Sequence, residues 1–367
     1  MKFCVIGAGN GGRAFAAYIS SKGYSVNLYN RSFSRIIDIK KKNQIKVSGE
    51  LKGNFPINFA TQNLKDAIRD VDVILIVVPA SAHKPIAEKI APYLSQDQII
   101  LLNPGRTFGA VEFCQIIEKK GISSTIFVAE TQTLLFTSRQ LKNNGVRILK
   151  IKDSVDFSAY PEKDTFFVYD TLKDVFPQLN PVDDYLEMTL NNIGMLLHPT
   201  LSLLNAGAMD CGIPFKFYAQ GATTRTCEVL EHIEVEINKI FKILGLNQFR
   251  FCKWVNKSYG INQKSIYKSI QGIKAYENID APRDLITRYF TEDIPTGLVP
   301  ISSIAKLLKV ETPIIDSVIN LSSILCGRDF RSEGRTIANL DLGTFIKKRI
   351  TSEELINSRT EQEILIN

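Results

Sequence analysis

The first 180 or so residues alternate short apolar runs with stretches of helical periodicity. The helical patterns lie at residues 14–21, 32–42 and 109–120. Runs of strand length are predicted at KFCVI, SVNLYN, VDVILIVVP, QIILLNPG and TIFVAE. Fully apolar strands are typical of parallel sheets, which are buried on both faces. The alternation therefore predicts an α/β fold, a doubly wound Rossmann-type domain.

The pattern changes after about Pro181. Long helical periods follow at residues 185–209, 222–244 and 301–308, with no convincing buried strand among them. The proline-containing FPQLNPVDD is the natural boundary, so we expect a Rossmann domain over 1–182 and an all-α domain over 183–367. The polar end, residues 351–367, is expected to be a final helix or a frayed tail.

Composition and charge narrow the class of protein. The formal charge of +7 is spread over 367 residues with no dominant Lys/Arg block, so we expect no nucleic-acid partner. The longest apolar run, residues 71–79, is too short to cross a bilayer, so we expect no membrane association. The six cysteines lack metal-site or redox-pair spacing, which predicts no metal and a reducing, cytoplasmic compartment.

The glycine-rich GAGNGG directly follows the first predicted strand and precedes a helix. Gly7 permits the tight turn, Gly9 lets the backbone approach a pyrophosphate, and Gly12 allows close packing of the helix on the sheet. Asn10 and Gly11 complete the loop at the positive helix N-terminus, where a phosphate binds. The strand–loop–helix context predicts a dinucleotide site, against the alternative of a glycine turn that binds nothing.

The end of the second predicted strand indicates which dinucleotide is held. Asn30 stands 18 residues after the last loop glycine, where an acid would accept the ribose hydroxyls of NAD(H). Arg31 and Ser32 instead offer a guanidinium and a hydroxyl to a 2′-phosphate, and Arg35 could add charge. This favours NADP(H) and leaves NAD(H) open, as does the alternative that the arginines are merely solvated. Pro79, at the end of a central strand, should line the nicotinamide side.

The chain has three histidines, so few residues can transfer protons near neutral pH. His232 has acidic neighbours at helical spacing and is expected at the surface, and His83 follows the strand expected to line the cofactor. His198 lies in the apolar NNIGMLLHPT just after the boundary. On the residues alone, it is either a hydrogen-bonded core histidine or the catalyst.

A second cluster of chemistry lies in APRDLITRYFTEDIPTGLVP. Charge clusters are usually solvated loops, but here Arg288, Glu292 and Asp293 are interleaved with aromatic and apolar residues. Arg288 could hold a carboxylate through a two-pronged hydrogen bond, and a neighbouring acid could orient a histidine. The sequence alone leaves open whether Asp293 meets His198.

Several motifs taken together resemble the opine dehydrogenases of the octopine/nopaline type. They are GAGNGG, VPASAH, NPGRTFGA, AETQTLLFTSR, NNIGMLLHP, RYFTEDIPTGLVPISSIAKL, VETPIID and GRT, and they run in order through both predicted domains. The resemblance implies an NAD(P)-dependent oxidoreductase acting on CH–NH donors. Its substrates would be an amino acid and a 2-oxo acid such as pyruvate, which condense to an imine that hydride reduces to a secondary amine.

The resemblance also assigns roles to residues. It implies that His198 is the general acid/base, that Asp293 pairs with it, that Arg288 binds the substrate carboxylate and that Glu130 contacts the amino-acid substrate. The chain departs from the family at Gln220 in FYAQGATT, where a glutamate is common, and this weakly disfavours a strongly basic amino acid.

Two alternatives remain at this point. One is a reductase of the ketopantoate or 2-hydroxyacid type, which has the same architecture but usually relies on a lysine early in the helical domain; residues 184–205 contain none. The other is a non-catalytic, dinucleotide-sensing protein, which would have no use for His198, Arg288 and Asp293 together. A homodimer is left open.

Overall fold

The computed structural model describes residues 1–122, 124–141 and 145–350, and these form two compact units. Unit 1 comprises residues 1–192 with the short segment 257–260, and unit 2 comprises the rest. The chain thus passes between units after Asn192 and not after residue 182, because helix α7 (Tyr185–Leu190) packs on a strand of unit 1. The tail expected over residues 351–367 lies outside the described residues.

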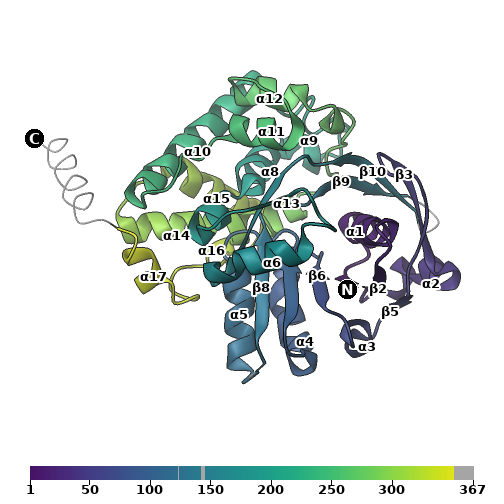
Figure 1. Ribbon diagram of the computed structural model, residues 1–367. Coiled ribbons are helices and arrows are strands. Elements are labelled where there is room, and N and C mark those ends of the chain that lie inside the picture. Colours follow the sequence, from purple (N-terminus) through teal and green to yellow (C-terminus); the bar gives the residue numbers. More distant parts are fainter. Residues whose placement is uncertain (123, 142–144, 351–367) are drawn as a thin grey trace, which may run out of the picture. The chain divides into compact units, whose positions relative to one another are not determined.

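Unit 1 is built on an eight-stranded sheet with strand order β12-β11-β8-β7-β6-β1-β2-β5. Figure 1 labels β8, β6, β2 and β5 of this sheet. Neighbouring strands run parallel except for the antiparallel pair β11 and β8. The predicted Rossmann-type domain is therefore confirmed. Its strands are β1 Lys2–Ile6, β2 Ser25–Tyr29, β5 Phe59–Thr61, β6 Val73–Ile76, β7 Gln98–Leu102, β8 Ile126–Thr131, β11 Val155–Tyr160 and β12 Leu179–Pro181.

Helices follow most of these strands, as the sequence pattern predicts. The helix expected over residues 32–42 is instead a short 3-10 turn at Phe33–Arg35 followed by α2. The helices of unit 1 include those predicted from the sequence and others that were not predicted. They are α1 Asn10–Ser21, α2 Ile37–Lys42, α3 Leu64–Ile68, α4 His83–Ile90, α5 Gly109–Lys119, α6 Thr165–Leu172 and α7.

A second, four-stranded sheet in unit 1 was not predicted from the sequence. Its order is β4-β3-β10-β9, and α1 packs against it as well as against β1 and β2. The aromatic ring of Phe136 on β9 meets that of Phe15 on α1 with centroids 4.7 Å apart. The first helix is thus enclosed by apolar contacts from both sheets. The strands are β3 Gln44–Gly49, β4 Gly53–Pro56, β9 Phe136–Gln140 and β10 Val146–Ile151.

The central strand β1 pairs with β2 on one side and β6 on the other, so the glycine-rich loop leaves the sheet at its carboxyl edge. Gly7 has a φ of +116°, and a Cβ there would lie 2.3 Å from the carbonyl oxygen of Val77. At Gly12, a Cβ would lie 1.6 Å from the carbonyl oxygen of Gly7. Only glycine fits both positions, which fixes the tight turn and the close approach of α1 to it.

We expect Gly12→Ala to lower the free energy of unfolding by about 3 kcal/mol and to weaken dinucleotide binding, because the added methyl group meets backbone that cannot move alone. Gly207→Ala is the matched control. A Cβ at Gly207 meets nothing within 4 Å, and helical alanine should add about 0.5–1 kcal/mol. Denaturant unfolding and nucleotide titration measure both effects. Equal stability of the two variants would contradict this account of the loop.

The described residues of unit 2 form helices joined by loops, with no strand and one isolated bridge between Lys216 and Asp280. The predicted all-α second domain is confirmed. The helical period expected over residues 185–209 is divided among α7, α8 and α9. The helices are α8 Ile193–Leu204, α9 Ala206–Asp210, α10 Thr224–Ile243, α11 Phe251–Tyr259, α12 Ile266–Gly272, α13 Arg288–Thr291, α14 Val299–Leu308, α15 Pro313–Cys326, α16 Phe330–Glu333 and α17 Gly343–Lys347. The last three residues of α11, 257–259, belong to the segment assigned to unit 1.

Helix α8 is the centre of unit 2. It packs against α10, α13 and α15, and nearly all of its residues are buried whichever way they point. A helix that is apolar on every side is stable only when other helices surround it. None of the helices in the described part of the chain is long and apolar enough to span a membrane.

Candidate active site

His198 is the one strongly polar side chain in the middle of α8. Its side chain is 14% exposed, while residues on both sides of it are buried. The next residue is Pro199, which has no N–H, so the carbonyl of Met195 lacks its usual helical donor at this turn. The imidazole is therefore held by a rigid, buried helix and keeps a small opening to its surroundings.

Asp293 lies against His198 in unit 2, although the two are 95 positions apart. It follows the short helix α13 and precedes a π-helical turn at Ile294–Leu298, an uncommon geometry that often occurs at functional sites. One Asp293 carboxylate oxygen lies 2.7 Å from Nδ1 of His198, and the Asp293 side chain is fully buried. A buried carboxylate at this distance orients the ring and stabilises its protonated form.

Aromatic rings enclose the His198 imidazole. The Tyr289 ring stacks on it with centroids 4.4 Å apart and planes 17° apart. The Tyr218 hydroxyl lies 3.0 Å from Nε2, the ring nitrogen that Asp293 does not contact. Both ring nitrogens thus have polar partners, and the imidazole plane is fixed by stacking.

Arg288 begins α13 and is close to the same cluster. Its side chain is exposed, and its guanidinium carbon lies 5.8 Å from the centre of the Tyr289 ring. Tyr289 therefore contacts both Arg288 and His198. This arrangement places an exposed cation on the other side of one aromatic ring contact from the imidazole.

The residues predicted to bind the dinucleotide gather in unit 1 around the loop after β1. Asn30, at the end of β2, accepts a hydrogen bond from the Ala8 backbone N–H at 3.0 Å and donates one to the carbonyl of Ser32 at 3.0 Å. Asn30 thus joins the glycine loop to the residues that follow β2 through hydrogen bonds. Arg31 and Ser32 follow it and are exposed, with no carboxylate at the position that usually accepts ribose hydroxyls.

Arg13 is a residue that the sequence analysis missed. It is 4% exposed, and its guanidinium donates to three carbonyl oxygens, those of Ala8, Gly145 and Arg35. Burial lowers the pKa of Arg13 below its usual value, and the charge of Arg35 adds to this effect. The Arg35 guanidinium in turn lies 3.8 Å from where a Cβ on Gly9 would be. Arg13 is followed by AFAA in the sequence, and nothing in this pattern indicates that its guanidinium would bind three backbone carbonyl oxygens.

Space beside Gly9 is otherwise open, which is what a pyrophosphate on this loop needs. Gly9 is the N-cap of α1 and has no side chain, so it leaves the backbone N–H groups of the first turn uncapped from this position. The Asn10 side chain accepts a hydrogen bond from the Gln140 backbone N–H at 2.8 Å, which ties the loop to β9. Pro79 is exposed after β6, beside Val77, whose carbonyl oxygen is close to Gly7. The loop, its open face and the nearby arginine fit a dinucleotide.

The resemblance implies that Glu130 contacts the substrate; in the structure its carboxylate is buried and hydrogen-bonded within unit 1. At the end of β8 it is 1% exposed, and its carboxylate accepts hydrogen bonds from Ala110 N–H at 2.6 Å, Thr189 Oγ1 at 2.5 Å and Tyr185 OH at 3.3 Å. A Cβ on Gly105 would collide with it. The carboxylate thus braces the loop after β7 within unit 1 and stabilises the N-terminus of α5.

Two other positions singled out in the sequence lie at the surface. Gln220 is exposed, and its side chain accepts from the Lys216 backbone N–H at 2.6 Å, so it closes a turn. The preference against a strongly basic amino acid, drawn from the charge lost at Gln220, stays a prediction. His232 is exposed on α10, as predicted, whereas His83 is buried at the start of α4.

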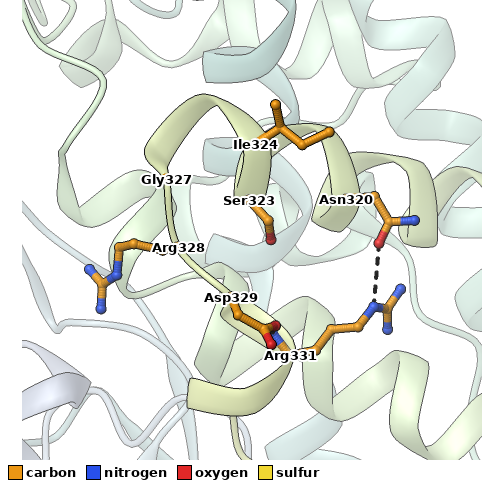
Figure 2. A pocket seen from close by; sticks show the side chains of 7 residues that line it. All are labelled: Asn320, Ser323, Ile324, Gly327, Arg328, Asp329 and Arg331. Atoms are coloured by element: carbon orange, nitrogen blue, oxygen red, sulfur yellow. Dashed lines mark hydrogen bonds between the residues drawn. The ribbon is translucent and has the colours of Figure 1, made fainter.

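A surface hollow in unit 2 is separate from this chemistry. Figure 2 shows it at the end of α15, where Asn320 accepts from Arg331. Its two arginines are paired, Arg331 with Asp316 at 2.6 Å and Arg328 with Glu333. His198, Asp293 and Arg288 do not line it. Among the described residues, no group of His, Cys, Asp or Glu could hold a metal ion, and all six cysteines are free thiols.

The fold and the two sets of residues define a class of enzyme. A Rossmann-type unit with an open glycine loop is typical of nicotinamide dinucleotide binding, and the helical unit holds a histidine oriented by a carboxylate, an arrangement suited to proton transfer. Together these features define a nicotinamide-dependent dehydrogenase of two-domain architecture.

Comparison with known proteins agrees in both units. Residues 181–326 match the model of the NAD/NADP octopine/nopaline dehydrogenase alpha-helical domain, and residues 2–127 match that of the NAD-dependent glycerol-3-phosphate dehydrogenase N-terminus. Opine dehydrogenase of Arthrobacter sp. (strain 1C) is 40% identical over 341 residues, covering 93% of this chain and 95% of the relative.

Two solved structures have the same fold. Octopine dehydrogenase described with NADH and pyruvate aligns with a TM-score of 0.73 at 20% identity, over 94% of this chain and 96% of that chain. NADP⁺-bound yersinopine dehydrogenase aligns with a TM-score of 0.71 at 12% identity, over 95% and 98%. The chain belongs to the opine dehydrogenase family, NAD(P)-dependent oxidoreductases that act on CH–NH donors and reductively condense an amino acid with a 2-oxo acid.

Proposed function

We propose that this chain joins pyruvate, or a 2-oxo acid of similar size, to an amino acid, with His198 as general acid/base and NADPH as the preferred reductant. The observation that carries the proposal is the 2.7 Å contact between His198 Nδ1 and the fully buried Asp293 carboxylate. A carboxylate with no access to water is a costly feature unless it serves a charged partner.

Asp293 determines which nitrogen of His198 does chemistry. An ionised carboxylate only accepts hydrogen bonds, so Nδ1 carries the proton and Nε2 is the free base. Nε2 can then take a proton from the amino acid's ammonium group, which makes the nitrogen nucleophilic, and can return it as water leaves the condensed intermediate. Arg288 holds a substrate carboxylate through its exposed guanidinium.

The dinucleotide is held by Gly7, Gly9 and Gly12, with Asn30 supporting the loop from below. When bound, the nicotinamide supplies the hydride that reduces the imine. The Glu130 carboxylate keeps the loop after β7 in place through its hydrogen bonds, and its contact with the amino acid stays a prediction of the resemblance. The free thiols support a reducing, cytoplasmic compartment for the reaction.

Preference for NADPH rests on charge around the end of β2. Asn30 stands where an acid would be needed for NADH, and Arg31 and Arg35 are exposed cations on the following turn. Arg35 is the more firmly positioned of the two. Arg13 donates a hydrogen bond to the Arg35 carbonyl at 2.8 Å. The Arg35 guanidinium lies beside Gly9. A guanidinium that reaches a ribose 2′-phosphate at the end of β2 favours NADPH, the dinucleotide that carries this phosphate.

We expect Arg31→Ala and Arg35→Ala each to weaken binding of 2′,5′-ADP at least about tenfold, since a hydrogen bond to a charged group contributes roughly 1.5–3 kcal/mol. Binding of 5′-AMP should change little. Calorimetric titration of both nucleotides measures the difference without any turnover, and Lys89→Ala, an exposed cation on α4, is the control. Equal losses for the two nucleotides would show that NADPH is not selected here.

The experiment that tests the proposed function is NADPH oxidation with pyruvate and a panel of neutral, acidic and basic amino acids. Oxidation that depends on both partners is expected. Oxidation with pyruvate alone would favour a 2-hydroxyacid-type reductase. No oxidation with any pair, in a protein that binds NADPH, would contradict this choice of oxo acid.

A further inference from the structure

The Tyr218 hydroxyl occupies the side of His198 on which the chemistry must occur. It lies 3.0 Å from Nε2, whereas Asp293 occupies Nδ1. We propose that Tyr218 is a catalytic residue that relays the proton between His198 and the substrate. This inference rests on the proposed function, because it adds a second proton carrier to the same reaction.

Packing fixes the position of the Tyr218 ring. The residue is 4% exposed, and its ring stacks on that of Tyr276 with centroids 4.1 Å apart and planes 17° apart. Phe217 meets it edge-on at 4.9 Å. The Tyr218 carbonyl oxygen accepts a hydrogen bond from Gln271 Nε2 at 3.2 Å, which fixes the backbone at this residue. The hydroxyl is thus aimed at His198 by a rigid aromatic stack and not by a mobile surface chain.

The direction of each hydrogen bond follows from the donors available. Because ionised Asp293 accepts from Nδ1–H, Nε2 of neutral His198 has a lone pair, and the Tyr218 hydroxyl donates to it. When Nε2 becomes protonated, the same bond reverses and Nε2–H donates to the tyrosine oxygen. The hydroxyl can therefore pass a proton either way without leaving its place.

The relay balances in both directions. On condensation, the substrate ammonium gives a proton to the Tyr218 oxygen as the phenolic proton moves to His198 Nε2, and the neutral amine attacks the carbonyl carbon. The electron pair of the C=O bond passes to the oxygen, which takes a second proton from the attacking nitrogen and becomes the hydroxyl of the condensed intermediate. On dehydration, Nε2–H returns its proton to the Tyr218 oxygen as the phenolic proton moves to the leaving hydroxyl. The C–O bond breaks, water departs, and the nitrogen lone pair forms the C=N bond. Tyr218 ends each step unchanged.

Tyr218→Phe tests the relay because it keeps the ring stack and removes only the hydroxyl. We expect kcat to fall about a hundredfold, within the range for a proton-transfer group. Proton transfer should then limit the rate, so the solvent isotope effect on kcat rises and the isotope effect from deuterated NADPH falls toward one. Tyr169→Phe, on α6 of unit 1, is the matched control and should behave as the parent protein.

Two results would overturn the relay. One is a kcat for Tyr218→Phe within twofold of the parent value. The other is a lower kcat with both isotope effects unchanged, which would indicate a purely structural role. If the variant fails to fold, the parent protein still provides a test, since its three histidines give only three sets of imidazole ¹⁵N signals.

In ¹⁵N-histidine-labelled parent protein, His198 is expected as the Nδ1–H tautomer with Nε2 accepting a hydrogen bond. The Nε2–H tautomer, or an Nε2 signal without a hydrogen bond, would contradict the relay. This measurement needs no substrate, so it separates the two proposals. A correct tautomer in a protein without condensation activity would remove the proposed function and leave the hydrogen-bond geometry intact.

Discussion

Replacing His198 by alanine is expected to lower kcat for condensation at least about a hundredfold, because the proton that activates the amine and releases water then has no carrier at Nε2. Binding of NADPH should stay nearly unchanged, since the glycine loop belongs to unit 1 and His198 to unit 2. Steady-state turnover and fluorescence titration of the nucleotide measure the two quantities.

His232→Ala is the matched control for this variant. His232 is exposed on α10, so its loss should leave turnover and the free energy of unfolding at the parent values. Parent-like turnover in His198→Ala would remove the acid/base assignment. A loss of NADPH affinity equal to the loss of turnover would show that the substitution damaged the protein more widely.

The second large effect is expected for Asp293→Asn, which keeps the shape of the side chain and removes its charge. An amide can donate to Nδ1 and so turn His198 into the tautomer that carries its proton on Nε2, where it cannot act as a base. In serine proteases the same exchange lowers kcat about 10⁴-fold. We expect a loss of roughly 10³–10⁴-fold here, measured as kcat at saturating substrates.

Asp210→Asn, an exposed acid at the end of α9, is the control for this exchange. Thermal unfolding of both variants separates lost chemistry from lost structure, since asparagine fills the same buried volume. If Asp293→Asn retained more than about a tenth of parent kcat, Asp293 would not be setting the tautomer of His198.

The sheet of unit 1 was largely predictable because its strands are fully apolar and alternate with helical periods. The second sheet was not, because β3, β4, β9 and β10 are short and mix polar with apolar residues, and their pairing joins segments about 100 positions apart. The division of residues 185–209 also escaped the periodicity. Asn191 ends α7 by bonding its side chain to the Glu187 carbonyl at 2.9 Å, a local competition that hydrophobic pattern does not record.

The candidate site was accessible from sequence to different degrees. His198 could be singled out as a candidate because the chain has few histidines, and Asp293 because its motif resembles that of a known family. Their contact could not be predicted, because only the folded chain brings the two residues together. Tyr218 was missed because a tyrosine beside phenylalanine is indistinguishable from ordinary core packing. Glu130 is at the end of a strand, as expected, but the sequence could not show that Ala110 and Thr189 would engage its carboxylate.

The identity of the product tests the central claim most directly. The parent protein is incubated with NADPH, pyruvate and a ¹⁵N-labelled amino acid that supports oxidation, and the product is analysed by mass spectrometry. The expected product is a secondary amine dicarboxylate that contains the carbon skeletons of both partners and one ¹⁵N atom. A hydroxy acid formed from pyruvate, with the labelled amino acid recovered unchanged, would contradict it.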